Sequence, residues 1–364
     1  MKSIIQVFIS NLFIWSVFFI TPNIYAFQYQ QVPETIKIGL LISNKNASDA
    51  KNGAEIAVKE ANKKGGINGI PVELVISSME GPWGTGSKQA VNLVFNENVW
   101  AILGSHNSQN AHLVEQATAK TQTVFLSAWA SDPSLSYAYV PWYFSIVPNN
   151  NQQANVLIQE IYNKRKLLNL AVVSNTQYDY KLAMQDFVKR VKKSGEKEPN
   201  QFVFSESDTN FQTIIENIKR TNADGIVLFT KPSFALNLMQ QIQKNNIELP
   251  VFGSIFLLGE DKAIHFDVSK YRNINLLSSG NWIEANETPF KKEFQKKYQK
   301  KPSAVAAYAY DGMKILIEAI KISKLEREKL QESISKIIYE GVTGTIQFDK
   351  HGKRINAVKL VELN

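Results

Sequence analysis

The 364-residue sequence lacks cysteine entirely, and it has only four histidines. The absence of cysteine excludes disulfide scaffolds, thiolate zinc sites, iron–sulfur clusters, cysteine nucleophiles and a lipid anchor attached to a cysteine. No two histidines have the spacing of metal ligands on a helix, so we expect no metal and no cofactor. A Gly-x-Ser-x-Gly elbow is also missing, so this motif of a serine hydrolase is excluded.

Charge is not concentrated in any one segment. The chain has 41 Lys+Arg against 33 Asp+Glu, a net charge of +8, and its basic residues are spread along the sequence. We therefore expect no nucleic-acid partner. Hydrophobic residues make up 44% of the chain, which is enough for a sizeable core and excludes intrinsic disorder. The length suggests about two domains.

Only the N-terminus carries a long apolar run. Residues 1–26 place one charge at Lys2, an apolar stretch over Ile4–Ile20, a helix breaker at Pro22 and a small residue at Ala26. This order is typical of a secretory signal peptide, and we expect cleavage after Ala26. An uncleaved membrane anchor is the alternative, because the run approaches spanning length. A secreted chain without cysteine suits the bacterial periplasm.

The rest of the chain alternates between strand patterns and helix patterns. The strands are short β-branched or aromatic runs, whereas the helices repeat apolar residues every three or four positions. The predicted strands are Ile36–Ile42, Val72–Ser77, Trp100–Gly104, Thr123–Ser127, Leu170–Ser174, Gln201–Ser205, Asp224–Phe229 and Pro250–Ser254. Such alternation predicts an α/β fold with mostly parallel sheets.

The alternating pattern occurs twice, over residues 34–127 and again over 168–255. Two such halves, joined by an extended segment at Trp142–Val147, predict two Rossmann-like lobes with a cleft between them. Ligands of open α/β sheets bind at the carboxyl ends of strands, so the loops that follow the strands form the candidate site.

The C-terminal part has a different pattern, in which helices dominate and strands return at the end. The predicted elements are a strand at Asn275–Ser279, helices at about 287–301, 303–323 and 327–340, and strands at Thr345–Phe348 and Ala357–Glu362 around a turn at 349–352. A chain that returns to strands in this way is expected to cross between the lobes again.

Three loops after strands carry candidate ligand-binding residues, and the first is Gly81–Lys88. It resembles a phosphate-binding loop, but Ser87 precedes Lys88 where the motif requires the reverse order. We therefore interpret this loop as a glycine-rich turn that lines the cleft, with Trp83 as a candidate wall.

The second loop, Gly104–Asn110, opens a predicted helix at Ala111–Lys120 and contains His106 and Ser108. Hydroxyl and amide side chains at a helix N-terminus cap free N–H groups, and the same N–H groups can bind an anion. Capping alone and capping combined with ligand binding both stay open. We interpret His106 as polar lining or surface rather than as a metal ligand.

The third loop is Ser127–Pro133. Here Trp129 offers a flat apolar wall, Ala130 lets a ligand approach the backbone, and Ser131 supplies a hydroxyl. A tryptophan buried in the core is the alternative interpretation.

Several segments, taken in order, resemble those of a known family. They are Ile36–Leu41, Asn52–Val72, Ala223–Phe229, Ala309–Gly312 and Gly341–Asp349. Over about residues 34–362 the chain resembles the type I periplasmic binding proteins of the branched-chain amino-acid (leucine-binding) receptor family. These receptors deliver solutes to ABC importers.

The resemblance implies two lobes joined by three crossings, near residues 145–148, 276–281 and 342–346. The first lobe is then expected to comprise 27–146 plus 281–342, and the second lobe 147–280 plus 343–364. Such receptors close about a hinge when a ligand contacts both lobes, and the permease recognises the closed form. We expect the protein to be a monomer.

Carried over position by position, the resemblance places the ligand carboxylate at Ser108 and at the loop Trp129–Ser131. Tyr178 falls where the family has a ligand-lining tyrosine, although Asp179 follows it in place of the usual glycine.

Two positions depart from the amino-acid receptors of the family. Ile255 stands where those receptors carry an acid that holds the ligand ammonium, and Lys231 stands where an aromatic residue is common. An ammonium group without a counter-charge is costly in a closed cleft. We therefore expect a carboxylate-bearing solute other than a simple aliphatic α-amino acid. It carries a second anionic group near Lys231 or an aromatic part against Trp129.

Asp132, Asp179 and Glu80 are alternatives for the missing acid. The predicted function is a periplasmic substrate-binding protein of an ABC importer, without enzymatic activity, that captures a small carboxylate-bearing solute such as an amino acid or a related organic acid. Ligand sensing for a signalling system is one alternative, and a secreted enzyme that uses the cleft through His106 and Ser108 is another.

Overall fold

The computed structural model describes residues 33–45, 47–105, 107–137, 140–208, 210–260, 273–285, 287–356 and 358–363. The predicted signal peptide and its cleavage point lie outside these ranges. Glu34–Asn364 form one compact unit. Within the described ranges, no helix combines the length and the apolar character needed to cross a membrane.

The first lobe is built on a five-stranded parallel sheet in the order β2-β1-β3-β4-β5. The strands are β1 (Ile36–Ile42), β2 (Val72–Ser78), β3 (Ala101–Ser105), β4 (Val124–Ser127) and β5 (Tyr143–Ser145). The helices are α1 (Asp49–Lys63), α2 (Thr85–Phe95), α3 (Ser108–Thr121), the short α4 (Ser134–Tyr137) and α10 (Ala304–Ile322).

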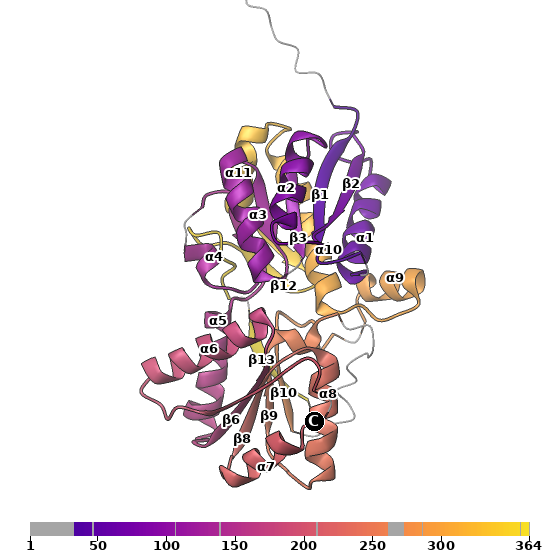
Figure 1. The fold of residues 1–364 in the computed structure, drawn as a ribbon. Coiled ribbons are helices and arrows are strands. Elements are labelled where there is room, and N and C mark those ends of the chain that lie inside the picture. The colour runs from indigo at the N-terminus through magenta and orange to yellow at the C-terminus, as the bar shows by residue number, and fades with distance from the viewer. Residues whose placement is uncertain are drawn as a thin grey trace, which may run out of the picture. The chain divides into compact units, whose positions relative to one another are not determined.

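Helices cover both faces of this first sheet (Figure 1). Successive side chains of a strand point to opposite faces. Leu40 of β1 therefore belongs to a buried cluster with α1 and α10, whereas Leu41 belongs to a different cluster with α2 and α3. The inner strands β1, β3 and β4 are buried on both faces, which explains why they are mostly apolar in the sequence, whereas the edge strand β2 is only half-buried.

The second lobe has a six-stranded sheet in the order β13-β10-β9-β8-β6-β7. The strands are β6 (Leu170–Asn175), β7 (Asn200–Phe204), β8 (Gly225–Phe229), β9 (Val251–Gly253), β10 (Ile274–Ser278) and β13 (Lys359–Leu363), of which only β13 is antiparallel to its neighbour. The helices are α5 (Asn150–Ile158), which continues as a π-helical turn over Gln159–Lys164, α6 (Tyr178–Lys193), α7 (Gln212–Arg220) and α8 (Pro232–Lys244).

The predicted α/β fold with mostly parallel sheets is confirmed, and every predicted strand lies within two residues of an observed one. The helix predicted at 327–340 is wrong beyond its first half. A 3₁₀ turn at Arg327–Lys329 leads into α11 (Leu330–Ser335), and the chain then extends as β11 (Ile338–Gly341). Strand β11 pairs with β12 (Gly344–Gln347), and this pairing satisfies backbone groups that a longer helix would have used internally.

The structure adds detail to two further segments. The connecting segment Trp142–Val147 supplies β5, the edge strand of the first sheet. The strands on either side of the turn at 349–352 do not pair with each other, because β12 pairs with β11 and β13 joins β10 in the second lobe. The remaining helix, α9 (Pro289–Tyr298), matches the one predicted near 287–301.

Segments that pass between the two sheets meet around Arg354. This side chain is 1% exposed, and its guanidinium donates to the carbonyl oxygens of Ile146 (3.1 Å), Thr343 (2.7 Å) and Thr345 (3.0 Å) and to Thr343 Oγ1 (3.1 Å). The guanidinium of Arg354 therefore connects the segment after β5 to the segment around β12 by hydrogen bonds.

Two further contacts hold the same region. Asp311 of α10 is fully buried and accepts hydrogen bonds from the backbone N–H groups of Val342 (2.9 Å) and Thr343 (2.8 Å). Gly280 approaches Gly344 so closely that a Cβ atom on Gly280 would lie 2.7 Å from Gly344 Cα. Ile146, Gly280 and Thr343 fall in the segments predicted to cross, while the lobe boundaries themselves stay a prediction.

Candidate ligand-binding cleft

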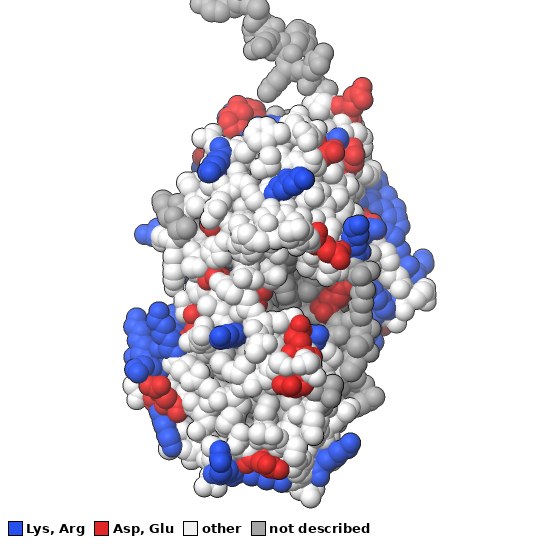
Figure 2. Space-filling view, in the orientation of Figure 1, with Lys and Arg blue, Asp and Glu red and all other residues white. Residues whose placement is uncertain are grey.

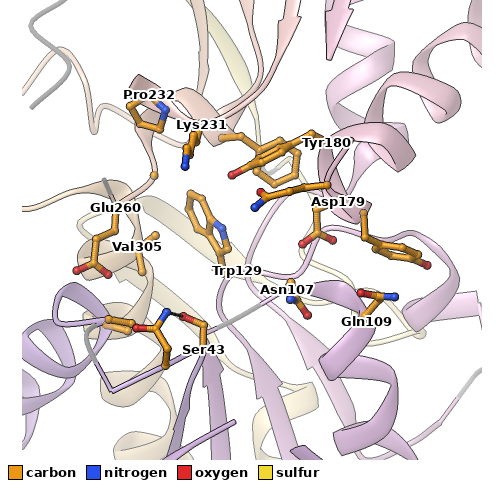
Figure 3. Close-up of a pocket in the computed structure, with 17 residues that line it drawn as sticks. Ser43, Asn107, Gln109, Trp129, Asp179, Tyr180, Lys231, Pro232, Glu260 and Val305 are labelled. Carbon is orange, nitrogen blue, oxygen red and sulfur yellow. Dashed lines mark hydrogen bonds between the residues drawn. The ribbon is translucent and has the colours of Figure 1, made fainter. Parts of the chain in front are cut away.

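A cleft of about 600 Å³ lies between the two lobes and is lined from both of them. Figure 2 shows the surface hollowed at this level, and Figure 3 shows side chains from the two lobes facing each other across the cleft. Its lining residues are Ser43, Asn44, Ala47, Ala50, Asn107, Gln109, Trp129, Gln177, Tyr178, Asp179, Tyr180, Lys231, Pro232, Phe256, Gly259, Glu260 and Val305.

Most of these residues come from loops at the carboxyl ends of strands. Ser43 and Asn44 follow β1, Trp129 follows β4, and Lys231 follows β8. Parallel strands bring their carboxyl ends to the same edge of a sheet, and the two sheets present these edges to the same cleft. The position of the site predicted from the topology therefore agrees with the position of the cleft.

An aromatic wall crosses the cleft from one lobe to the other. The Trp129 ring lies 6.3 Å from the Phe256 ring at an interplanar angle of 69°, and Tyr180 lies 5.0 Å from Phe256 at 83°. On its other side Trp129 lies 6.1 Å from Tyr308 of α10. Edge-to-face packing of this kind fixes ring orientations, so Trp129 presents a rigid apolar surface to the cleft.

The N-terminus of α3 forms a polar end of the cleft. Asn107 is the N-cap, and its side chain accepts a hydrogen bond from Asn110 N at 3.0 Å, which confirms the predicted capping. Ser108 is fully buried, and its N–H donates to the two carboxylate oxygens of Asp179 at 3.1 and 3.3 Å. Burial raises the pKa of the Asp179 carboxyl, while hydrogen bonds from Ser108 oppose the rise.

The N-terminus of α1 is capped in the same way by the opposite lobe. Glu260 Oε1 accepts hydrogen bonds from Ser48 N (2.9 Å), Ser48 Oγ (3.0 Å) and Asp49 N (3.0 Å). Burial raises the pKa of the Glu260 carboxyl, and the nearby Asp49 raises it further. Two helix N-termini of the first lobe are thus occupied by carboxylates of the second lobe.

Of the nine predicted site residues, three line the cleft and three more lie buried beside it. Trp129, Tyr178 and Lys231 line it directly. Ser108 lies at its floor beneath Asp179, and Ala130 and Ser131 lie buried next to Trp129 in the same loop. The hydroxyl of Ser131 is buried without a hydrogen-bond partner among the described residues. Their role in binding a ligand stays a prediction.

Of the other three predicted residues, one is directed to solvent, one is buried outside the cleft lining and one lies outside the described residues. Trp83 is 74% exposed, because the glycine-rich turn that starts α2 directs it outward. Ile255 is buried at the start of a 3₁₀ turn, where its N–H donates to Gln153 Oε1 at 3.2 Å. His106 lies outside the described residues.

Sequence reasoning missed part of the wall and the acid that caps α1. Phe256 and Glu260 lie on an irregular segment after β9, and no motif marked them. Asp179 was noted as a departure from the usual glycine and as one alternative for the missing acid, but its contact with Ser108 was not predicted. In the parts of the chain that the structure describes, no group of three or more histidine or acidic side chains could hold a metal ion.

Behind the floor of the cleft, His112 of α3 pairs with two acids. Its Nε2 lies 2.9 Å from Asp132 Oδ2, and its Nδ1 lies 3.7 Å from Glu115 Oε2. Hydrogen bonds to Asp132 and then to Glu115 raise the pKa of His112 from 6.5 to about 9. Asp132 N in turn donates to Ser108 Oγ at 3.3 Å, so this charged cluster supports the floor of the cleft.

The raised pKa of His112 predicts a loss of stability at alkaline pH. The stabilisation is complete below about pH 6.5 and is lost as the pH rises through about 9. Because the imidazole is partly exposed, we expect a loss of about 1 kcal/mol in the free energy of unfolding between pH 7 and about pH 10. Urea titrations at both pH values give the free energy of unfolding of the unsubstituted protein and of His112→Gln. The loss on raising the pH should be larger in the unsubstituted protein. An equal pH dependence in both proteins would contradict the prediction.

Comparison with known proteins agrees with this architecture. The periplasmic binding protein family model matches residues 35–364. The Leu/Ile/Val-binding protein homolog 1 of Brucella melitensis is 22% identical over 329 residues, covering 87% of this chain and 86% of the relative.

Solved structures have the same fold. One is the branched-chain amino-acid transporter substrate-binding protein LivJ of Streptococcus pneumoniae in complex with isoleucine. Its TM-score is 0.76 at 24% identity, over 90% of this chain and 99% of that one. Another is an R. palustris solute-binding protein in complex with benzoate, with a TM-score of 0.75 at 17% identity, over 91% and 93% of the chains.

These matches confirm the resemblance that the sequence segments indicated. The family model covers both sheets and the segments that line the cleft. Two α/β lobes, a cleft at the carboxyl ends of their strands, and a family match over almost the whole described chain all agree. The chain belongs to the periplasmic binding protein family.

Proposed function

We propose that this protein is the periplasmic substrate-binding protein of an ABC importer and captures a small carboxylate-bearing solute by closure of the two lobes. The observation that supports it most is the cleft itself, which draws its lining from both lobes and joins an aromatic wall to a helix N-terminus. A solute that contacts both lobes stabilises the closed form relative to the open one. The family name implies a periplasmic location, reached through the signal peptide predicted at residues 1–26.

The ligand class is inferred from the N-terminus of α3 and from the side chains of the second lobe. The N–H groups at the start of α3 suit a carboxylate. The Brucella relative is named a homolog of Leu/Ile/Val-binding proteins, the LivJ structure contains isoleucine, and the R. palustris structure contains benzoate. All of these ligands carry a carboxylate. Here Ile255 carries no acid for an ammonium. Asp179 and Glu260 line the cleft, but their carboxylates already accept hydrogen bonds at the N-termini of α3 and α1. An organic acid with an aromatic part against Trp129 therefore fits better than a simple aliphatic α-amino acid.

Lys231 supports an additional anionic group at the second lobe. Its ammonium lies 3.5 Å from Glu206 and 4.7 Å from the centre of the Phe234 ring, so it is positioned at the cleft edge. An anion that enters the cleft competes with the half-exposed Glu206 for this charge. The importer's permease is the proposed partner, and we propose a monomeric receptor.

Native mass spectrometry of the exported protein, with gentle unfolding to release a trapped small molecule, tests this proposal. A co-purified organic acid supports it and identifies the ligand class. Leucine, isoleucine or valine would overturn the inference from Ile255 and Lys231. Thermal denaturation with a panel of acids, amino acids and aromatic carboxylates follows, since binding to the folded state raises stability. The receptor proposal fails if no solute is released and no panel member shifts the transition.

Replacing Trp129 with alanine is expected to weaken binding of the identified solute about 10- to 100-fold, because the apolar wall of the cleft is lost. Trp83→Ala is the matched control, since Trp83 is 74% exposed and does not line the cleft. Isothermal titration calorimetry of both variants gives the dissociation constants. Equal effects of the two substitutions would contradict a ligand contact at Trp129.

A further inference from the structure

The amide at the floor of the proposed carboxylate site is already occupied by a carboxylate of the protein. Asp179 belongs to the first turn of α6 in the second lobe, and its two oxygens lie 3.1 and 3.3 Å from Ser108 N in the first lobe. Ser108 is fully buried under this contact. One N–H group cannot serve two carboxylates at full strength, so a solute carboxylate and Asp179 compete for the same donor.

Among the described residues, the surroundings of Asp179 contain no unpaired cation that would let two carboxylates coexist. The charged groups that act on it are Asp132, which opposes its ionisation, and His112, which is already paired with Asp132 and Glu115. Lys231 lines the same cleft, but its ammonium pairs with Glu206. Two carboxylates at one desolvated donor repel each other. The solute carboxylate therefore binds to Ser108 N only if the Asp179 carboxylate gives up its hydrogen bond to that group.

The same arrangement at α1 shows what the contact does for the lobes. Glu260 of the second lobe accepts from Ser48 N and Asp49 N of the first lobe, as Asp179 accepts from Ser108 N. Both acids thus bridge the two lobes through hydrogen bonds from helix N-termini of the first lobe. Of the two, only Asp179 occupies the donor proposed for the solute.

We propose that Asp179 is a specificity-determining residue that holds the place of the solute carboxylate in the empty cleft. This inference rests on the proposed function. A small acid such as acetate gains too little from the cleft to displace Asp179, whereas an acid with a large apolar part gains the aromatic wall as well. Asp179 thereby selects against small, abundant carboxylates in favour of larger ones.

The test uses two substitutions at Asp179 in the full-length exported protein. Asp179→Asn removes the charge with little change of shape, and Asp179→Ala removes the acceptor. Asp186→Asn is the matched control, because Asp186 is on the same helix but binds Asn150 Nδ2 at 2.9 Å and does not line the cleft. The probes are acetate and benzoate, measured by calorimetry, and hydrogen–deuterium exchange at the Ser108 amide without any ligand.

We expect exchange at Ser108 to be at least about 10-fold faster in Asp179→Ala than in the unsubstituted protein and in Asp186→Asn. We expect Asp179→Asn to bind acetate at least about 10-fold more tightly, with a smaller gain for benzoate. Weaker or unchanged acetate binding in Asp179→Asn would overturn the inference.

The outcomes separate this inference from the proposed function. Unchanged exchange at Ser108 in Asp179→Ala overturns the inference, even where the protein still binds an organic acid. If Ser108 is exposed in Asp179→Ala but no variant binds any carboxylate, the carboxylate ligand of the proposed function is overturned, and the selectivity assigned to Asp179 is overturned with it.

Discussion

Replacing Arg354 with methionine is expected to lower the free energy of unfolding by about 3–5 kcal/mol. The guanidinium is 1% exposed and donates to the carbonyl oxygens of Ile146, Thr343 and Thr345. Methionine fills much of the volume but donates no hydrogen bond, so these buried acceptors lose their partner. Urea denaturation followed by circular dichroism measures the change.

The control for this prediction is Arg220→Met, because Arg220 is exposed at the end of α7 and its guanidinium donates to the nearby Asn217 Oδ1. It should change stability by less than about 0.5 kcal/mol. Arg354→Lys separates charge from geometry, since lysine keeps the charge but lacks the planar fork. A loss below about 1 kcal/mol in Arg354→Met would contradict the structural role given to this residue.

The second large effect is expected at Gly280, where alanine should lower stability by about 2–4 kcal/mol. Gly280 has φ +53°, and a Cβ atom there would lie 2.7 Å from Gly344 Cα, Gly344 N and Thr343 O. All three are backbone atoms, so two connecting segments would have to separate. Because these segments belong to the predicted crossings, we expect the substitution to weaken solute binding as well.

Gly195→Ala provides the matched control for the clash. Gly195 also has positive φ, +78°, but a Cβ atom there would meet nothing within 4 Å. Alanine at this position loses only the backbone preference, about 1 kcal/mol. The difference between the two variants in urea denaturation isolates the steric contribution at Gly280. If both variants lose the same stability, the close approach is not a constraint.

The strands could be predicted because their signals are local. Ile36–Ile42 is an apolar run interrupted only by Lys37 and Gly39, and β1 has the same bounds in the structure. The segment after Ser335 could not be assigned correctly, because Ile334, Ile337 and Ile338 fit a helix periodicity as well as a strand. Pairing of β11 with β12 decided the outcome, and that pairing is not visible in a local pattern.

Only the cleft residues that directly follow a strand could be predicted from the sequence. Trp129 and Lys231 follow strands directly, so the rule that ligands bind at carboxyl ends of strands was enough to find them. Asp179 and Glu260 acquire their roles from contacts across the cleft with Ser108 and Ser48. Such contacts depend on how the lobes meet, and no spacing in the sequence encodes that.

The late position of α10 in the chain has a consequence for folding. This helix packs on α1 in the first lobe, and Tyr310 bonds Glu60 across a sequence separation of 250 residues. Contacts of such long range close slowly, because the chain entropy of a large loop is lost before the contact forms. The core of the first lobe therefore stays incomplete until the second lobe and the segment beyond it have been synthesised. The two lobes are expected to mature together, and a truncated chain that ends before α10 leaves the apolar face of α1 uncovered and prone to aggregate.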